Sequence, residues 1–137
     1  MKPTHPFYVP IILFLFLFTS CIERNSDDPN EVYKLWSGRE PEKEIKITKG
    51  QYWQSAHFTL EYRMYMELYA TREWLKEFIK INNLKAHTSS INLPYDAPTW
   101  FSPKIGLQAF SSSEYTQGSI YFIDFKTGYL LFYEIQL

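Results

Sequence analysis

Carboxylates in apolar surroundings are the first residues to weigh as proton donors or acceptors. Glu61 and Glu67 share one face if the segment that holds them is a strand, and six residues at about 3.3 Å each place them roughly 20 Å apart. A glycosidase-type acid pair needs about 5–9.5 Å between its carboxyl groups, which excludes these two. We therefore expect them to flank Arg63 on a solvated face, where such ion pairs contribute little.

Two further acids lie near the end of the chain. Asp124 opens the connection between two apolar segments, a position typical of an acid that stabilises a turn. Glu134 lies within a strongly apolar segment, where burial would raise its pKa or require a partner. The alternative that we favour is a glutamate at a sheet edge or facing solvent. A small hydrolase would draw its acid and base from His57, Asp124 and Glu134.

Metal and nucleotide chemistry have little support. His57 and His87 are separated by thirty positions and have no acid or histidine at ligand spacing, whereas a zinc site needs three or four ligands. The chain has no Gly-x-Ser-x-Gly or Ser-x-x-Lys pattern, and its 5 glycines are too dispersed to form a phosphate-binding loop. We expect no catalytic residue, no metal ligand and no cofactor.

The segment Lys85–Pro103 has the composition of a long loop, yet it carries large aromatic side chains. Trp100 and Phe101, with Tyr95 nearby, form the candidate binding residues, because Trp and Tyr dominate binding hot spots. The alternative, which we favour slightly, is that these rings cover an open end of the sheet. Aromatic residues make up 19% of the chain, which by itself favours a β-rich core.

Hydrophobic periodicity predicts one long strand followed by one helix. From Phe58 to Tyr69 apolar residues fill the even positions, which is the alternation of a strand. Thr71 can cap a helix over Arg72–Asn82, whose apolar residues recur at helical spacing. Further strands are predicted at Glu44–Lys49, Lys104–Phe110, Ser119–Phe125 and Tyr129–Leu137.

The last two of these strands form a hairpin around Lys126-Thr127-Gly128, where Gly128 supplies a positive φ. Together the elements indicate an α+β fold, with an antiparallel sheet of about four or five strands and one helix packed on one face. The other face must then be covered by loops or offered to a partner.

The beginning of the chain has the order of a secretory signal. Lys2 is followed by the apolar run Val9–Phe18, interrupted by Pro10, and then by small polar residues before Cys21. The run is shorter than the roughly 20 apolar residues of a membrane span. Cys21 is the only cysteine, so structural disulfides within the chain are excluded.

The stretch Leu17-Phe18-Thr19-Ser20-Cys21 resembles the lipobox of bacterial lipoproteins, although Phe18 stands where that family prefers leucine. The resemblance implies export, cleavage before Cys21, a lipid (palmitate) on Cys21 and a location in the cell envelope. Ile22, rather than aspartate, follows the cysteine, which by the same resemblance implies the outer membrane. The predicted organisation is a signal peptide over 1–20, a lipid-anchored flexible tether over 21–30 and a single α+β domain over 31–137.

Three functions are compatible with these observations. The first, which we favour, is a non-catalytic, lipid-anchored binding or inhibitory module whose partner is an envelope protein or glycan. The second is a small envelope hydrolase, and the third is a structural accessory lipoprotein. A formal net charge of −1 leaves no electrostatic footprint for nucleic acid.

Overall fold

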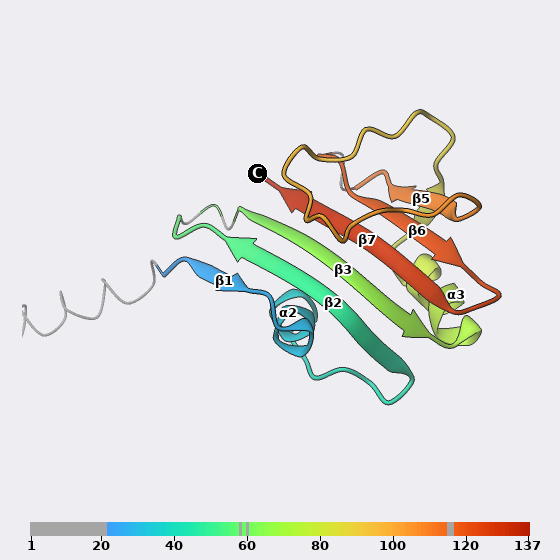
Figure 1. The fold of residues 1–137 in the computed structure, drawn as a ribbon, viewed down its shortest axis with the longest axis horizontal. Helices are drawn as coiled ribbons and strands as arrows, with labels where there is room; N and C mark the ends of the chain where they lie inside the picture. Colours follow the sequence, from blue (N-terminus) through green and yellow to red (C-terminus); the bar gives the residue numbers. More distant parts are fainter. Residues whose placement is uncertain (1–21, 58, 60, 115–116) are drawn as a thin grey trace, which may run out of the picture.

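The computed structural model describes residues 22–57, 59, 61–114 and 117–137. The predicted signal peptide and Cys21 therefore lie outside the described residues, as do Phe58 and Leu60 of the predicted long strand. The described chain forms an antiparallel sheet of seven strands in the order β1-β2-β3-β7-β6-β5-β4 (Figure 1). The strands are β1 (Arg24–Ser26), β2 (Ile45–Gln54), β3 (Tyr62–Ala70), β4 (Leu84–Ala86), β5 (Gln108–Ser112), β6 (Ile120–Asp124) and β7 (Tyr129–Gln136).

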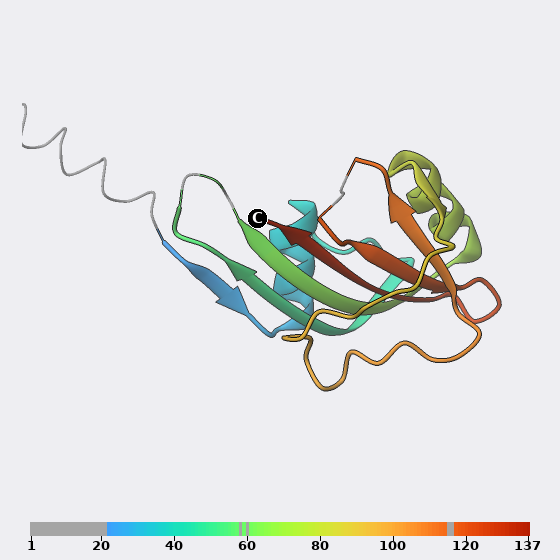
Figure 2. The same ribbon diagram turned by 90° about the horizontal axis from the view of Figure 1, so that it is seen from above.

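Two helices, α2 (Pro29–Ser37) and α3 (Arg72–Ile81), lie on one side of this sheet, and the long connection between β4 and β5 crosses the other side (Figure 2). The predicted α+β class is confirmed. The expectation of about four or five strands and one helix is wrong, because in the described residues the sheet has seven strands and two helices cover it.

The alternation predicted around β3 is confirmed from Tyr62 onward. Met64, Met66 and Leu68 are fully buried beneath the helices, whereas Arg63 and Glu67 point to the other face. This arrangement follows from the two-residue period of a strand. Because β3 lies between β2 and β7, its alternation determines which face of the sheet belongs to the helices.

The helix predicted after Thr71 is also confirmed. The Thr71 hydroxyl accepts a hydrogen bond from the backbone N–H of Trp74 at 3.2 Å, which satisfies one of the unpaired donors of the first turn. Leu75 and Phe78 are buried against the sheet, and Asn82 caps the carboxyl end. At α2, Asp28 plays the same capping role toward the N–H of Glu31, at 2.8 Å.

Residues 24–30, assigned above to a flexible tether, belong to the folded unit in the structure. Arg24–Ser26 pairs with Gln54–Tyr52 of β2, and Pro29 begins α2. The Ser26 hydroxyl donates to Glu31 at 2.6 Å. Order in this polar segment comes from backbone pairing and capping, not from burial of apolar side chains, which explains why its composition suggested a linker.

Two apolar clusters lie on the two faces of the sheet. Under the helices, Val32, Leu75 and Phe132 belong to the larger cluster. On the other face, Phe101, Phe122 and Tyr133 belong to the smaller one, which is covered by the loop over 87–107. Among the described residues no helix has the length and apolarity needed to cross a membrane.

Candidate functional site

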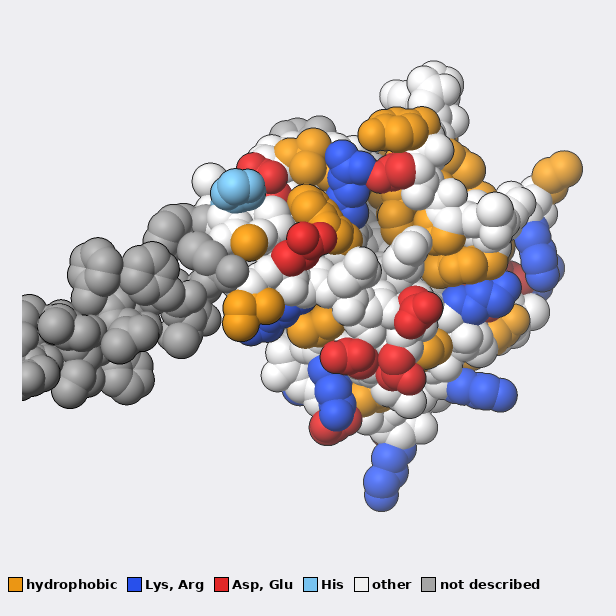
Figure 3. Space-filling model, turned by 60° about the vertical axis from the view of Figure 1, so that its left-hand side comes forward, with side chains coloured by type: hydrophobic (Ala, Val, Ile, Leu, Met, Phe, Trp, Pro, Cys, Tyr) orange, Lys and Arg blue, Asp and Glu red, His pale blue; other side chains and the backbone are white. Residues whose placement is uncertain are grey.

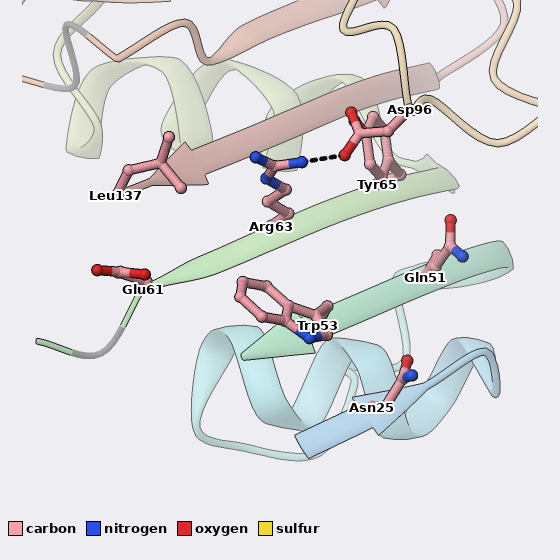
Figure 4. Close-up of a pocket in the computed structure, with 8 residues that line it drawn as sticks. All are labelled: Asn25, Gln51, Trp53, Glu61, Arg63, Tyr65, Asp96 and Leu137. Carbon is pink, nitrogen blue, oxygen red and sulfur yellow. Dashed lines mark hydrogen bonds and ion pairs between the residues drawn. The ribbon is translucent and has the colours of Figure 1, made fainter. Parts of the chain in front are cut away.

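A groove is open on the face of the sheet that the helices leave uncovered. It has a volume of about 430 Å³ and spans the β1–β3 half of the sheet, beside the loop that covers the other half (Figure 4). We call it the sheet groove; its lining residues are Asn25, Gln51, Trp53, Glu61, Arg63, Tyr65, Asp96 and Leu137. Its volume falls within the range of small-ligand sites.

Strand register brings the lining residues together. Asn25 on β1 pairs with Trp53 on β2, which pairs in turn with Arg63 on β3. Gln51 and Tyr65 form the next row that points to the same face. Directly paired residues have Cβ atoms about 4.5–5.5 Å apart, so each row is a continuous line of side chains across the strands.

The indole of Trp53 is held in place. Its Nε1 donates a hydrogen bond of 2.6 Å to Oε1 of Glu23, which precedes β1. The side chain is half-buried, and in Figure 4 its ring stands between Asn25 and Arg63. A ring that is oriented before binding gives contact area at a low entropic cost.

Arg63 and Tyr65 bind the loop to the sheet through Asp96. The Arg63 guanidinium forms an ion pair with Oδ2 of Asp96, drawn dashed in Figure 4, and the Tyr65 hydroxyl donates to Oδ1 at 3.1 Å. Burial of the Tyr65 hydroxyl and, to a smaller extent, the nearby Asp96 carboxylate raise the pKa of Tyr65. The hydroxyl therefore keeps its proton and donates it in a hydrogen bond. The loop side of the groove is therefore a charged and hydrogen-bonded wall.

The pairing of Arg63 corrects one expectation. Arg63 pairs with Asp96, not with Glu61 and Glu67 on either side of it. Glu67 instead accepts hydrogen bonds from the hydroxyls of Thr48, at 2.7 Å, and Tyr129, at 2.9 Å. The loop supplies a carboxylate that is 33 positions away in the sequence, which no local spacing could indicate.

The three aromatic residues predicted for binding lie in different surroundings. Tyr95 is 95% exposed and borders a shallower hollow of about 270 Å³ that shares Arg63, Asp96 and Leu137 with the sheet groove. Trp100 is half-buried, with the Lys49 ammonium 5.7 Å from its ring centre.

Phe101 is only 4% exposed and packs edge-on against Tyr65, with ring centres 5.2 Å apart. Trp100 packs beside it, with ring centres 6.0 Å apart, so this part of the loop covers the smaller apolar cluster. Of the three predicted residues, Tyr95 alone adjoins the groove; Trp100 and Phe101 are not among the residues that line it.

Glu134 is buried, so the expectation of a solvent-facing glutamate is wrong. It is 8% exposed and lies on the helix side of β7, opposite the sheet groove. Its Oε2 accepts hydrogen bonds from Trp36 Nε1 and from the Tyr62 hydroxyl, each at 2.9 Å, and its Oε1 accepts one from the Tyr121 hydroxyl at 2.6 Å. We expected that a buried Glu134 would need a hydrogen-bond partner, and the structure provides three donors.

The other members of the predicted acid–base set lie elsewhere. Asp124 accepts from the backbone N–H of Lys126 at 2.8 Å and the hydroxyl of Thr127 at 2.9 Å, which confirms its role in the turn. These hydrogen bonds lower the pKa of Asp124. Asp124 pairs with Tyr129, five residues before Glu134, a separation of roughly 17 Å along β7. His57 is exposed in the β2–β3 connection, so the structure does not bring the three together.

No cluster of three metal-binding side chains occurs within the described residues. His87 lies with Nδ1 3.1 Å from the Ser111 hydroxyl.

On the side of the molecule shown in Figure 3, acidic and basic side chains are interspersed with hydrophobic ones. Recognition on that side would rest on individual contacts, because charges of both signs are mixed across it.

Asn25, Gln51 and Trp53 line the sheet groove but were not among the predicted binding residues. The predicted strand, Glu44–Lys49, stopped before Gly50, yet β2 continues to Gln54. Had the alternation been carried past the glycine, Gln51 and Trp53 would have fallen on the same face as each other, opposite Tyr52. The alternation of side chains along β2 could therefore have predicted that Gln51 and Trp53 share one face of the sheet.

Comparison with known proteins adds no relative: no family model matches the chain, and neither the curated proteins nor the solved structures contain a match.

Proposed function

We propose that the protein is a non-catalytic binding module, held at a bacterial outer membrane by a lipid on Cys21, and that the sheet groove binds an envelope glycan. The lipobox resemblance of residues 17–21 supports the anchor. A lipid anchor holds the chain at the membrane without any hydrophobic docking surface on the domain. The open face of the sheet is then free for a ligand.

The row of Asn25, Trp53 and Arg63 is the observation that carries the proposal. A sugar ring presents an apolar C–H face and a rim of hydroxyls. The fixed indole of Trp53 offers a flat apolar surface to the C–H face of the sugar. The side-chain amides of Asn25 and Gln51 offer both donors and acceptors to the sugar hydroxyls. Arg63 adds a charged donor at the far end of the row.

The test uses the full-length chain, purified in a mild detergent, and soluble glycan fragments released from the host envelope. Trp53→Ala should weaken binding by roughly tenfold or more, because it removes the central aromatic contact. Trp100→Ala is the matched control, since that indole is half-buried outside the groove. Binding that is lost with Trp100→Ala and retained with Trp53→Ala would place the site on the loop and overturn the groove assignment. Absence of glycan binding by the wild-type chain would overturn the ligand class.

The anchor is tested separately. Cys21→Ser should release the exported protein from the membrane fraction and abolish incorporation of labelled palmitate. A Cys21→Ser chain that is exported and stays bound to the membrane contradicts the lipid anchor.

A further inference from the structure

A second hollow lies on the opposite face of the sheet, between α2 and α3. It has a volume of about 340 Å³ and opens beside the two helices. We call it the helix cleft; its main lining side chains are Trp36, Arg39, Tyr62, Trp74, Phe78 and Glu134. None of these residues lines the sheet groove.

The cleft has a carboxylate among its lining groups. Glu134 is 8% exposed and is surrounded by uncharged donors: the indole N–H of Trp36 and the hydroxyls of Tyr62 and Tyr121. Among the described residues no lysine, arginine or histidine forms an ion pair with it. A buried negative charge held only by neutral donors favours a cation that can approach it, because the surrounding medium screens the attraction weakly.

The walls of the cleft are aromatic. Trp74 and Phe78 stack with ring centres 5.1 Å apart and planes inclined by 12°. Trp36 also packs against Phe78, with ring centres 6.1 Å apart. Aromatic faces attract cations through their quadrupole, most strongly when water is excluded.

The charges at the rim do not cancel that of Glu134. Arg39 lines the cleft, but its guanidinium lies 3.3 Å from a carboxylate oxygen of Glu42. Glu77 also lines the cleft and lies 3.8 Å from the ammonium of Lys80. Arg39 and Glu77 are thus both in ion pairs at the rim of the cleft. Among the described residues that line the cleft, Glu134 is the acidic side chain without a cationic partner.

We propose that the helix cleft binds an organic ammonium group of the quaternary or fully methylated kind. Three hydrogen bonds already occupy most of the roughly four lone-pair positions of the Glu134 carboxylate. A primary ammonium would be left with unsatisfied donors, whereas a quaternary ammonium has none and needs only negative charge and aromatic surface. The site is independent of the sheet groove and of the glycan assignment.

The test follows the indole N–H signals of the full-length chain by nuclear magnetic resonance while tetramethylammonium chloride is added at constant ionic strength. The signals of Trp36 and Trp74 should shift saturably, and those of Trp53 and Trp100 should stay in place. Sodium chloride controls for charge alone, and 2,2-dimethylpropanol, a neutral molecule with a similar branched shape, controls for apolar filling. Equal shifts from the neutral alcohol, or no saturable shift with tetramethylammonium, would overturn the proposal.

Three variants locate the interaction. Glu134→Gln keeps the side-chain shape and removes the charge, and should weaken tetramethylammonium binding roughly tenfold or more. Trp74→Leu leaves Glu134 intact, should weaken binding by a smaller factor, and decides the matter if Glu134→Gln does not fold. Glu73→Gln removes an exposed acid of the same helix that does not line the cleft and should bind as the wild type does. A folded Glu134→Gln with wild-type affinity, or a folded Trp74→Leu with wild-type affinity, contradicts the assignment.

Discussion

Arg63 on β3 and Asp96 in the β4–β5 connection form an ion pair that joins the loop to the open face of the sheet. The same carboxylate accepts a hydrogen bond from the Tyr65 hydroxyl at 3.1 Å. One loop residue is thus held by two successive outward-facing residues of β3. The loop can cover one half of the sheet face and leave the other half open because it is tied at this boundary.

Asp96→Ala should loosen the loop without unfolding the sheet. Both side chains of the ion pair are about 30% exposed, so the loss of unfolding free energy should be only about 1 kcal/mol. Amide hydrogen exchange over residues 91–102 should become faster, whereas exchange in β3 and β7 should not change. Glu40→Ala, which breaks a solvent-exposed pair with Lys34, is the control and should leave the loop unaffected. Unchanged exchange in the loop of Asp96→Ala would show that the apolar contacts of Phe101 hold it alone.

Glu134→Ala should be strongly destabilising. The substitution removes the acceptor of three donors that come from α2, β3 and β6; the hydrogen bond from Tyr121 is buried, and those from Trp36 and Tyr62 are partly buried. Loss of the acceptor of a buried donor costs about 1–3 kcal/mol. We expect a loss of about 3 kcal/mol or more in urea unfolding, and a smaller loss for Glu134→Gln, whose amide oxygen still accepts. Glu44→Ala, at an exposed position before β2, should change stability by less than about 0.5 kcal/mol. A loss below about 1 kcal/mol for Glu134→Ala would mean that water replaces the carboxylate.

The parts of the fold that local patterns describe were predictable. The alternation through Met64, Met66 and Leu68 and the helical spacing of Leu75 and Phe78 each place one apolar face toward one layer. The turn at Gly128, with φ of 76°, follows equally from a local signal. These segments bury their own apolar side chains, and so their structure appears in their own composition.

The remaining parts depend on contacts between distant segments. β1 and β4 have three residues each, and backbone pairing with a longer neighbour is what defines them as strands. Gly50 suggested the end of a strand, but it lies within β2. A glycine is needed there because a Cβ at this position would come 2.9 Å from the Cβ of Val32 on α2. The glycine permits the helix to approach the sheet, and the β2 residues beyond it supply Gln51 and Trp53 to the sheet groove.

The candidate sites show the same division. The parity of β7 already placed Glu134 on the same face as Leu130 and Phe132, both fully buried. What the sequence could not supply were its donors, which are contributed by three other elements and, for Trp36, lie 98 positions away. The pattern placed Glu134 among apolar residues, but a solvent-facing glutamate was the favoured interpretation; its burial, and the donors that stabilise it there, came from the structure.

Alkaline pH should destabilise the fold through its buried tyrosines. Burial raises the pKa of Tyr33, Tyr65 and Tyr129 above the value near 10 of a free phenol. The folded state therefore holds these protons more tightly than the unfolded state does. Their contribution to stability is fully present below about pH 10 and is lost as the pH rises toward the folded-state values.

Phenolate absorbance and circular dichroism, followed together as the pH rises above 10, check this prediction. Part of the tyrosine absorbance should appear only as the fold is lost. Tyr33→Phe removes a phenol that donates to Glu42 at 2.6 Å and should reduce the steepness of the alkaline transition. Complete ionisation of all tyrosines in a chain that keeps its native dichroism would contradict the prediction.

Two glycines with positive φ should differ in their tolerance of alanine. Gly128 has φ of 76° and a Cβ there would collide with the carbonyl oxygen of Ala70 at the end of β3; Gly106 has φ of 95° with open space around it. Both substitutions pay for a strained backbone, about 1 kcal/mol, but only Gly128→Ala adds a clash with a hydrogen-bonded backbone. Ala70 N–H donates to the Gly128 carbonyl at 2.9 Å, so the two segments cannot separate without losing that bond.

We therefore expect Gly128→Ala to lose about 3 kcal/mol or more in urea unfolding, and Gly106→Ala about 1 kcal/mol. The pair is matched because each glycine lies in a turn that precedes a strand, β7 for Gly128 and β5 for Gly106. Equal losses would show that the β6–β7 turn can shift away from Ala70. In that case the contact between Gly128 and Ala70 would not limit the packing of the hairpin against β3, and the backbone conformation alone would account for the glycine at this position.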